Sequence, residues 1–208
     1  MTSLRPPSPP HDALLQQARL NTEEQRDADA ILEWMAWVGC ADDEGHQLRV
    51  MFLTMRLASA LQMVDSAEER RIVIRAGLLH DVGKVLIPAV IVNKPGPLSS
   101  EERRVIEQHA ALGARLAASY PGIEPEVLDA IHYHHEQFNG RGYPAGLIGD
   151  EIPRLARILS VADVYDALTS HRSYRDAWSH AAAEAYLRSY AGEMFEPEIV
   201  DAFCALGT

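Results

Sequence analysis

From about Thr22 to the C-terminus, the apolar residues of this chain recur at the three- and four-residue spacing of amphipathic α-helices. No useful length of alternating apolar and polar residues predicts a strand, and only the apolar run at 85–92 is ambiguous. We therefore predict an all-α fold, a compact bundle of about seven or eight helices. The segments expected to be helical are 22–38, 43–63, 66–80, 99–119, 124–136, 153–170, 179–191 and 197–206.

Short polar motifs set the expected helix starts. Ser99 followed by Glu102 is a capping-box pattern, and Thr22 with Gln25 forms a similar one. The segment 87–98 contains three prolines, so we expect a loop with at most a short helix there.

Glycine and proline mark the remaining boundaries. The segment 139–153 is rich in both residues and is expected to form a structured loop. Four of the twelve prolines lie in the first ten residues, so residues 1–21 are predicted to be a flexible proline-rich tail. Residues 22–208 are predicted to form one helical domain.

Composition excludes several functional classes. The net charge of −11 argues against general nucleic-acid binding, which needs basic surface, so we expect no DNA or RNA partner. No apolar stretch is long enough to span a bilayer, and the N-terminus lacks the pattern of an export signal. The two cysteines, Cys40 and Cys204, are far apart, which fits a reducing compartment. We predict a cytoplasmic protein without membrane association.

Histidine and aspartate recur where metal ligands would be useful. A lone histidine is more often a packed or surface residue than a ligand, and we apply that reading to His11, His132, His171 and His180. Five other positions form a joint pattern: His46, His80-Asp81, His109, His134-His135 and Asp163.

The types of these residues indicate the chemistry. Imidazole together with carboxylate suits Fe, Mn or Zn. Adjacent residues such as His80 and Asp81 point about 100° apart on a helix, so they can address two neighbouring metals. A bridging carboxylate and several imidazoles are what a binuclear hydrolytic site requires.

These residues lie in segments that resemble a known family. Residues 78–84, LLHDVGK, resemble the signature of the HD superfamily of metal-dependent phosphohydrolases. Residues 134–144, HHEQFNGRGYP, are similar to the second signature of the HD-GYP subfamily. ADVYDALTS at 162–170 and RSYR at 172–175 follow in the family's order, and the resemblance extends from about His46 to the C-terminus.

The resemblance implies a fold, a reaction and a ligand set. It implies the HD helical fold and hydrolysis of cyclic di-GMP to linear pGpG, GMP or both, by a water activated at two or three transition-metal ions, with Fe or Mn favoured. Asp81 would bridge the metals and act in catalysis. Asp42 stands where three-metal members have glutamate, and its alternative role is a solvated carboxylate at a helix start. The implied metal ligands are Asp42, His46, His80, Asp81, His109, His134, His135 and Asp163.

The resemblance also implies substrate contacts. Lys84 would contact the scissile phosphate and assist catalysis, and Arg172 and Arg175 would hold the phosphates of the ligand. The loop Gly142-Tyr143-Pro144 would line the substrate site, contact a protein partner or simply anchor itself. The oligomeric state stays open, with a homodimer as one option. Two alternatives also stay open: an HD-type hydrolase of another nucleotide, and a non-catalytic module that senses a cyclic dinucleotide or binds a partner.

Overall fold

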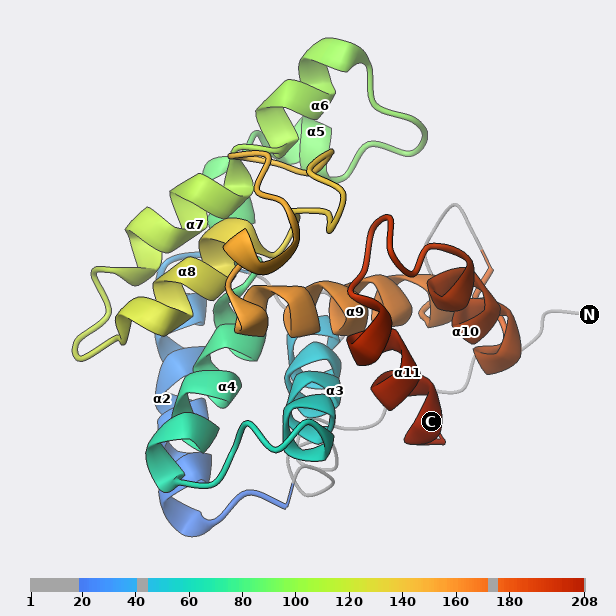
Figure 1. Cartoon of the computed structure of the whole chain (residues 1–208). Helices are drawn as coiled ribbons and strands as arrows, with labels where there is room; N and C mark the ends of the chain where they lie inside the picture. The colour runs from blue at the N-terminus through green and yellow to red at the C-terminus, as the bar shows by residue number, and fades with distance from the viewer. Residues whose placement is uncertain (1–18, 41–44, 172–175, 208) are drawn as a thin grey trace, which may run out of the picture.

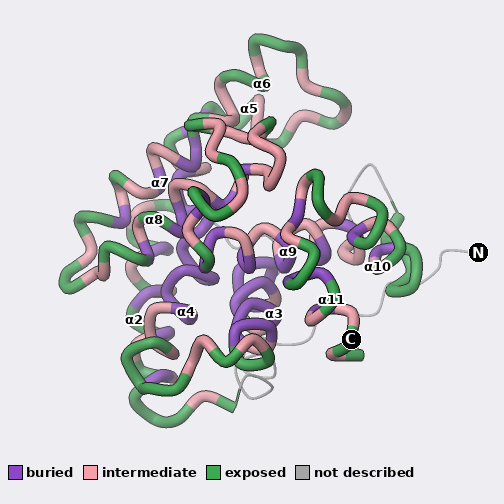
Figure 2. The backbone as a smooth tube through the Cα atoms, viewed as in Figure 1, coloured by how far each residue is buried: buried purple, intermediate pink, exposed green. Residues whose placement is uncertain are grey.

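Helix α3 (His46–Ala60) lies in the interior of the fold, where α4, α9 and α11 pack against it, and ten of its fifteen residues are buried. The computed structural model describes residues 19–40, 45–171 and 176–207. Within these ranges α4 packs along α3, α2 covers α4, and α9 crosses α3 near its N-terminal end (Figure 1). Buried positions therefore concentrate in α3, α4 and α9 (Figure 2).

The described residues contain helices and no strands, which confirms the predicted all-α class. Two isolated β-bridges, at Asn139 with Ile148 and at Ala191 with Phe195, are the strand-like pairings among them. No helix in the described ranges is both long enough and apolar enough to cross a bilayer. The remaining elements are α2 (Thr22–Trp37), α4 (Ala67–Leu79), the 3-10 helix η1 (Val82–Leu86), α5 (Ala89–Val92), α6 (Ser100–Ile106), α7 (His109–Ala117), α8 (Pro125–Tyr133), the 3-10 helix η2 (Gly149–Glu151), α9 (Arg154–Thr169), α10 (His180–Ser189) and α11 (Pro197–Ala205).

Local capping signals explain several helix starts. The predicted capping box of Ser99 with Glu102 is present, because the Ser99 hydroxyl accepts from the N–H of Glu102. The box predicted for Thr22 is wrong by one residue, since Asn21 is the N-cap and Glu24 completes the box. The division of the chain at residue 22 stays a prediction, because residues 1–18 are outside the described ranges.

The single helix expected over 99–119 is divided into α6 and α7. At the break, Nδ1 of His109 donates to the carbonyl of Ile106 over 2.7 Å. That carbonyl would otherwise accept a backbone N–H one turn later in an uninterrupted helix. The break begins a new helix at His109 and places this side chain in the interior, where it is 2% exposed.

A buried ionic cluster joins α2 and α4 to the segment before α8. Arg75, 8% exposed, donates to both carboxylate oxygens of Asp27, at 2.6 and 2.9 Å. Arg75 also donates to Glu124 over 3.0 Å and to the Gly122 carbonyl over 2.7 Å. Because every charge in the cluster has a partner, its role is to hold these elements together.

Glu24 provides a pH-dependent part of the stability. Its buried carboxylate accepts from Nε of Arg70 at 2.5 Å and from the N–H of Asn21 at 2.9 Å. The hydrogen bond from Arg70 outweighs the opposing effect of burial and lowers the pKa of Glu24 below 4.5. A lowered pKa in the folded state means that this stabilisation is complete above the unfolded pKa and disappears as pH falls through the folded one.

We therefore expect Glu24→Gln to lower the free energy of unfolding by about 1 to 2 kcal/mol near neutral pH. The difference from the unmodified protein should shrink once pH drops below 4.5, because protonated Glu24 then also lacks its charge. Urea unfolding at neutral and acidic pH measures both values. A difference that stays constant down to acidic pH would show that the ion pair contributes nothing.

Candidate metal centre

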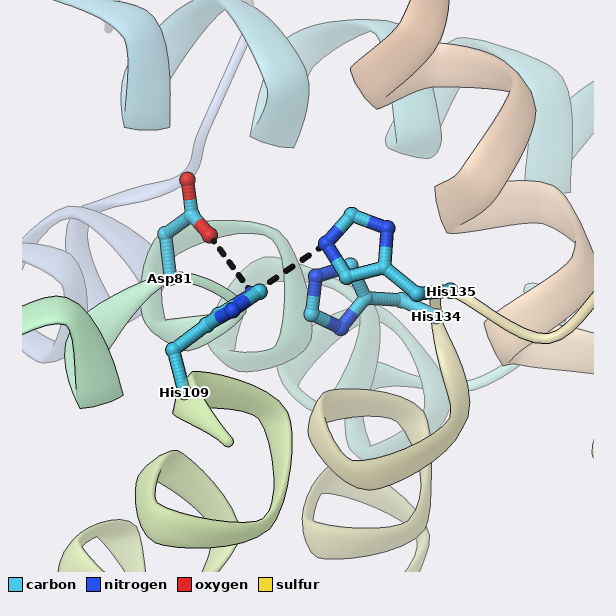
Figure 3. A group of neighbouring side chains, drawn as sticks. All are labelled: Asp81, His109, His134 and His135. Carbon is cyan, nitrogen blue, oxygen red and sulfur yellow. Dashed lines mark hydrogen bonds and ion pairs between the residues drawn. The ribbon is translucent and has the colours of Figure 1, made fainter. Parts of the chain in front are cut away.

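Seven of the predicted ligands converge in one buried cluster, which we call the metal cluster. They come from separate elements: the start of α3, the end of α4, the break before α7, the end of α8 and the middle of α9 (Figure 1). Figure 3 shows four of them, with the His109 ring between Asp81 and His135. The members of the metal cluster are His46, His80, Asp81, His109, His134, His135 and Asp163.

Three rings are held in the same way by backbone carbonyls three residues earlier. Nδ1 of His80 lies 2.8 Å from the Gly77 carbonyl, and Nδ1 of His134 lies 2.8 Å from that of Ile131. His109 repeats the contact at the α6–α7 break. Since a carbonyl only accepts, each Nδ1 carries the proton and each Nε2 presents a lone pair to the interior. This is the tautomer that binds a metal through Nε2.

His46 is held differently, by a carboxylate. Its Nδ1 lies 2.8 Å from Oδ2 of Asp166, a buried residue on α9. Arg49 and Ser170 donate to the same carboxylate. We assigned no role to Asp166 from the sequence, although it lies three residues after Asp163 and so on the same helix face.

Asp81 faces two groups of histidines with its two oxygens. Oδ2 lies 3.5 Å from Nε2 of His46 and 3.5 Å from Nε2 of His80. Oδ1 lies 3.3 Å from Nε2 of His109. Asp81 lies between α4 and η1, where it is the N-cap of η1, instead of lying with His80 within one helix. It is nevertheless the carboxylate that both groups share.

The donor atoms fit bound metal ions. Nε2 atoms of His46 and His80 are 3.2 Å apart, and those of His109 and His135 are 3.1 Å apart. Two nitrogens that are bound to the same ion, each at about 2.0–2.1 Å from it, would lie roughly 3 Å apart. The buried Nε2 of His134 and Oδ1 of Asp81 have no hydrogen-bond partner within the described residues. A buried polar atom without a partner is costly, and a cation between these donors would satisfy them.

The pKa of one histidine in the metal cluster is raised, whereas the pKa values of two others are lowered. Burial disfavours a charged His46, but the hydrogen bonds with Asp166 and Asp81 outweigh it and raise its pKa to about 10. Burial, reinforced by neighbouring His109, lowers the pKa of His135 to about 3 and holds that of His134 well below its usual range. Burial opposes the charged form of Asp81, yet the ammonium group of Lys84 keeps the pKa of Asp81 well below normal. Metal ions would therefore meet a charged carboxylate and two neutral rings, and would displace a proton from His46.

One side of the cluster is accessible. His80 and His134 are fully buried, whereas His135, Asp163 and Lys84 are only half-buried. Lys84 forms an ion pair with Asp81. An ammonium group is thus present where an anionic ligand would approach the cluster from solvent.

The Gly-Tyr-Pro loop closes over the same side. The Tyr143 ring stacks on the His135 ring with centroids 4.9 Å apart, and the backbone N–H of Tyr143 donates to the backbone carbonyl of His135 over 3.3 Å. Gly142 is required because a Cβ there would lie 2.3 Å from the backbone nitrogen of Gln137. The loop therefore contacts a predicted ligand directly.

Glu136 anchors this loop, a role that we did not predict. Its carboxylate is 3% exposed and accepts from the backbone N–H groups of Ala145, Gly146 and Leu147 at 2.6 to 3.2 Å. A buried charge that accepts several N–H bonds stabilises one loop conformation.

Three predicted site residues lie outside the described ranges: Asp42, Arg172 and Arg175. Helix α3 begins at His46, and its N-cap, Gly45, has a left-handed φ of 83°.

The chain is similar in sequence to several known proteins. A family model described as "HD domain" matches residues 17–199. The cyclic di-GMP phosphodiesterase response regulator RpfG of Xanthomonas campestris is 45% identical over 145 residues, covering 69% of this chain and 38% of that protein. A cyclic di-GMP phosphodiesterase of Pseudomonas aeruginosa is 38% identical over 158 residues, covering 76% and 37%. A 3'3'-cGAMP-specific phosphodiesterase of Vibrio cholerae is 38% identical over 157 residues, covering 75% and 30%.

The chain spans at most 38% of the length of these three relatives.

Two solved structures support the fold. An HDG"Y"P protein from Bdellovibrio bacteriovorus aligns with a TM-score of 0.67 at 18% identity, covering 94% of this chain and 77% of that one. A cyclic GMP-AMP-specific phosphodiesterase from V. cholerae aligns with a TM-score of 0.59 at 22% identity, covering 78% and 43%. The chain belongs to the HD domain family, within its HD-GYP group.

Proposed function

We propose that this chain is a phosphodiesterase that hydrolyses cyclic di-GMP to linear pGpG, GMP or both, with transition-metal ions bound in the metal cluster. The observation that carries the proposal is the shared carboxylate, Asp81, whose two oxygens face separate groups of imidazoles. That arrangement suits a pair of ions and a hydrolytic reaction. The names of relatives that are 45% and 38% identical support the choice of substrate.

The proposed ligands divide into two metal positions. The first position would use His46, His80, Asp81 and Asp163, and the second would use Asp81, His109, His134 and His135. We propose iron or manganese, because mixed imidazole and carboxylate donors suit first-row transition metals. Asp42 would serve a third position. When bound, such ions supply an activated water and neutralise charge on the phosphoryl oxygens.

The surrounding residues would bind and orient the substrate. Lys84 lies beside Asp81 on the accessible side of the cluster, where its ammonium can stabilise charge on a scissile phosphate. Arg172 and Arg175 would hold the phosphates through their planar guanidinium groups. Tyr143 would keep His135 in place and line the substrate site together with Gly142 and Pro144.

Two finer proposals concern the surroundings of the enzyme. The loop Gly142-Tyr143-Pro144 would offer a contact to a protein partner, and a homodimer is one option for the assembly. The low cysteine content supports a cytoplasmic location.

A mixed cyclic dinucleotide is the second candidate substrate. The observation that favours it is the 38% identity to a relative named as 3'3'-cGAMP-specific. Chromatography of reactions with cyclic di-GMP, 3'3'-cGAMP and a nucleoside polyphosphate would rank these substrates by kcat/KM. Binding of cyclic di-GMP by metal-loaded protein without turnover would instead support a sensor module.

Metal removal should abolish activity. We expect a chelator-treated, dialysed sample to hydrolyse cyclic di-GMP at least ~10³-fold more slowly than anaerobically loaded protein. Addition of Fe²⁺ or Mn²⁺ under anaerobic conditions should restore the rate, and Mg²⁺ should not, because the predicted donors are mostly nitrogen. Equal rates in the loaded and stripped samples would refute a metal-dependent mechanism.

A further inference from the structure

We infer that Asp166 is a positioning residue that fixes the His46 ring and thereby sets the metal affinity of the first position in the metal cluster. This inference rests on the proposed metal centre and adds a residue that is not among its ligands. Asp166 points at the far nitrogen of His46, so it acts on the metal position through that ring.

The contacts of Asp166 leave its carboxylate little freedom. Oδ1 accepts from Nε of Arg49 at 2.6 Å. Oδ2 accepts from Nδ1 of His46 at 2.8 Å, from a terminal guanidinium nitrogen of Arg49 at 3.1 Å and from the Ser170 hydroxyl at 3.2 Å. The Asp166 residue is 3% exposed, so these bonds form away from water.

Helix periodicity makes the network possible. His46 and Arg49 are three residues apart on α3, and Asp163 and Asp166 are three residues apart on α9, so each pair shares a helix face. Where α9 crosses α3, one member of each pair faces the metal cluster and the other supports it. Asp163 lies 3.4 Å from Nε2 of His46, while Asp166 holds Nδ1 of the same ring. The ring is therefore clamped between two carboxylates of one helix.

The contrast with the other rings explains why the effect should be local. His80, His109 and His134 are oriented by neutral backbone carbonyls. A carboxylate is a stronger acceptor than a carbonyl, so it makes the imidazole a better electron donor and fixes its tautomer more firmly. Loss of the charge on Asp166 should weaken the position that includes His46 and leave the position of His109, His134 and His135 unchanged.

Co²⁺ titration under anaerobic conditions tests the inference, because its visible absorption reports both affinity and ligand geometry. Asp166→Asn keeps the shape of the side chain and removes its charge. We expect one of the two Co²⁺ affinities to fall roughly 10- to 100-fold and its absorption band to change, with the other affinity retained. Arg49→Gln leaves the hydrogen bond from His46 to Asp166 in place. It should weaken the same affinity by about threefold or more, which tests the inference even if Asp166→Asn does not fold.

Asp27→Asn is the matched control, because Asp27 is also a carboxylate paired with a buried arginine, but lies outside the metal cluster. It should lower thermal stability and leave both Co²⁺ affinities intact. The inference is overturned if Asp166→Asn behaves like this control, with reduced stability and two unchanged affinities. A wild-type protein that binds no Co²⁺ would overturn the proposed function itself, and this inference with it.

Discussion

Asp81→Ala is expected to abolish hydrolysis of cyclic di-GMP, with turnover lowered by at least ~10⁴-fold. The reason is that, among the residues that the structure describes, Asp81 is the carboxylate whose two oxygens face both groups of the metal cluster. Its removal takes a shared ligand from each proposed position and leaves six groups, five of them neutral when they bind metal. A site with less negative charge holds divalent ions more weakly, so metal content should fall together with activity.

The design of this experiment separates chemistry from folding. Asp81→Asn has nearly the same volume and keeps one carbonyl oxygen, so it should retain more metal than Asp81→Ala. Circular dichroism of both variants verifies that the helices persist, and liquid chromatography with elemental analysis of the same samples measures turnover and metal. A fully metallated and active Asp81→Ala protein would show that Asp81 has no bridging role.

Gly83→Ala is expected to lower the free energy of unfolding by at least about 3 kcal/mol and to weaken metal binding. A Cβ at Gly83 would lie 2.0 Å from the carbonyl oxygen of His109 and 2.5 Å from the backbone nitrogen of Gly113. Both atoms belong to the backbone of α7, so a side-chain rotation cannot relieve the clash. Helix α7 would have to move away from η1 and would carry His109 away from Asp81.

Gly122→Ala is a control for the loss of glycine itself. A Cβ there meets nothing within 4 Å, although its φ of 71° is left-handed, so the expected cost is only about 1 kcal/mol. Urea unfolding of the two variants without metal compares their stabilities, and Co²⁺ titration compares their metal affinities. A Gly83→Ala protein as stable as Gly122→Ala would show that the close approach of η1 and α7 is not needed.

Local signals in the sequence predict most of the helices. Capping residues such as Ser99 act within one turn, so their effect does not depend on the rest of the fold. The break before α7 could not be predicted in this way. It depends on the ring of His109 turning back to Ile106 and on the contact of Gly83 with α7, and both require the folded arrangement.

In the metal cluster, too, some residues can be predicted from the sequence and others cannot. Its ligands stand in short motifs that the sequence displays directly, and all seven within the described residues converge. The supporting residues do not stand out, because their roles depend on contacts that form only in the folded chain. Asp166 contacts the ring of His46, which is 120 residues away in the chain. Glu136 accepts from backbone N–H groups of a loop whose conformation cannot be predicted from its sequence. The contact of Asp166 with His46 becomes visible once α9 is placed across α3.

The number of transition-metal ions per chain is the measurement that tests the central claim most directly. Elemental analysis of anaerobically purified protein, supplied with Fe²⁺ or Mn²⁺ and then desalted, should find at least two ions in each wild-type chain. The same analysis of Asp81→Ala should find at most one. A wild-type protein that retains no transition metal after this treatment would contradict the metal centre and the proposed reaction together.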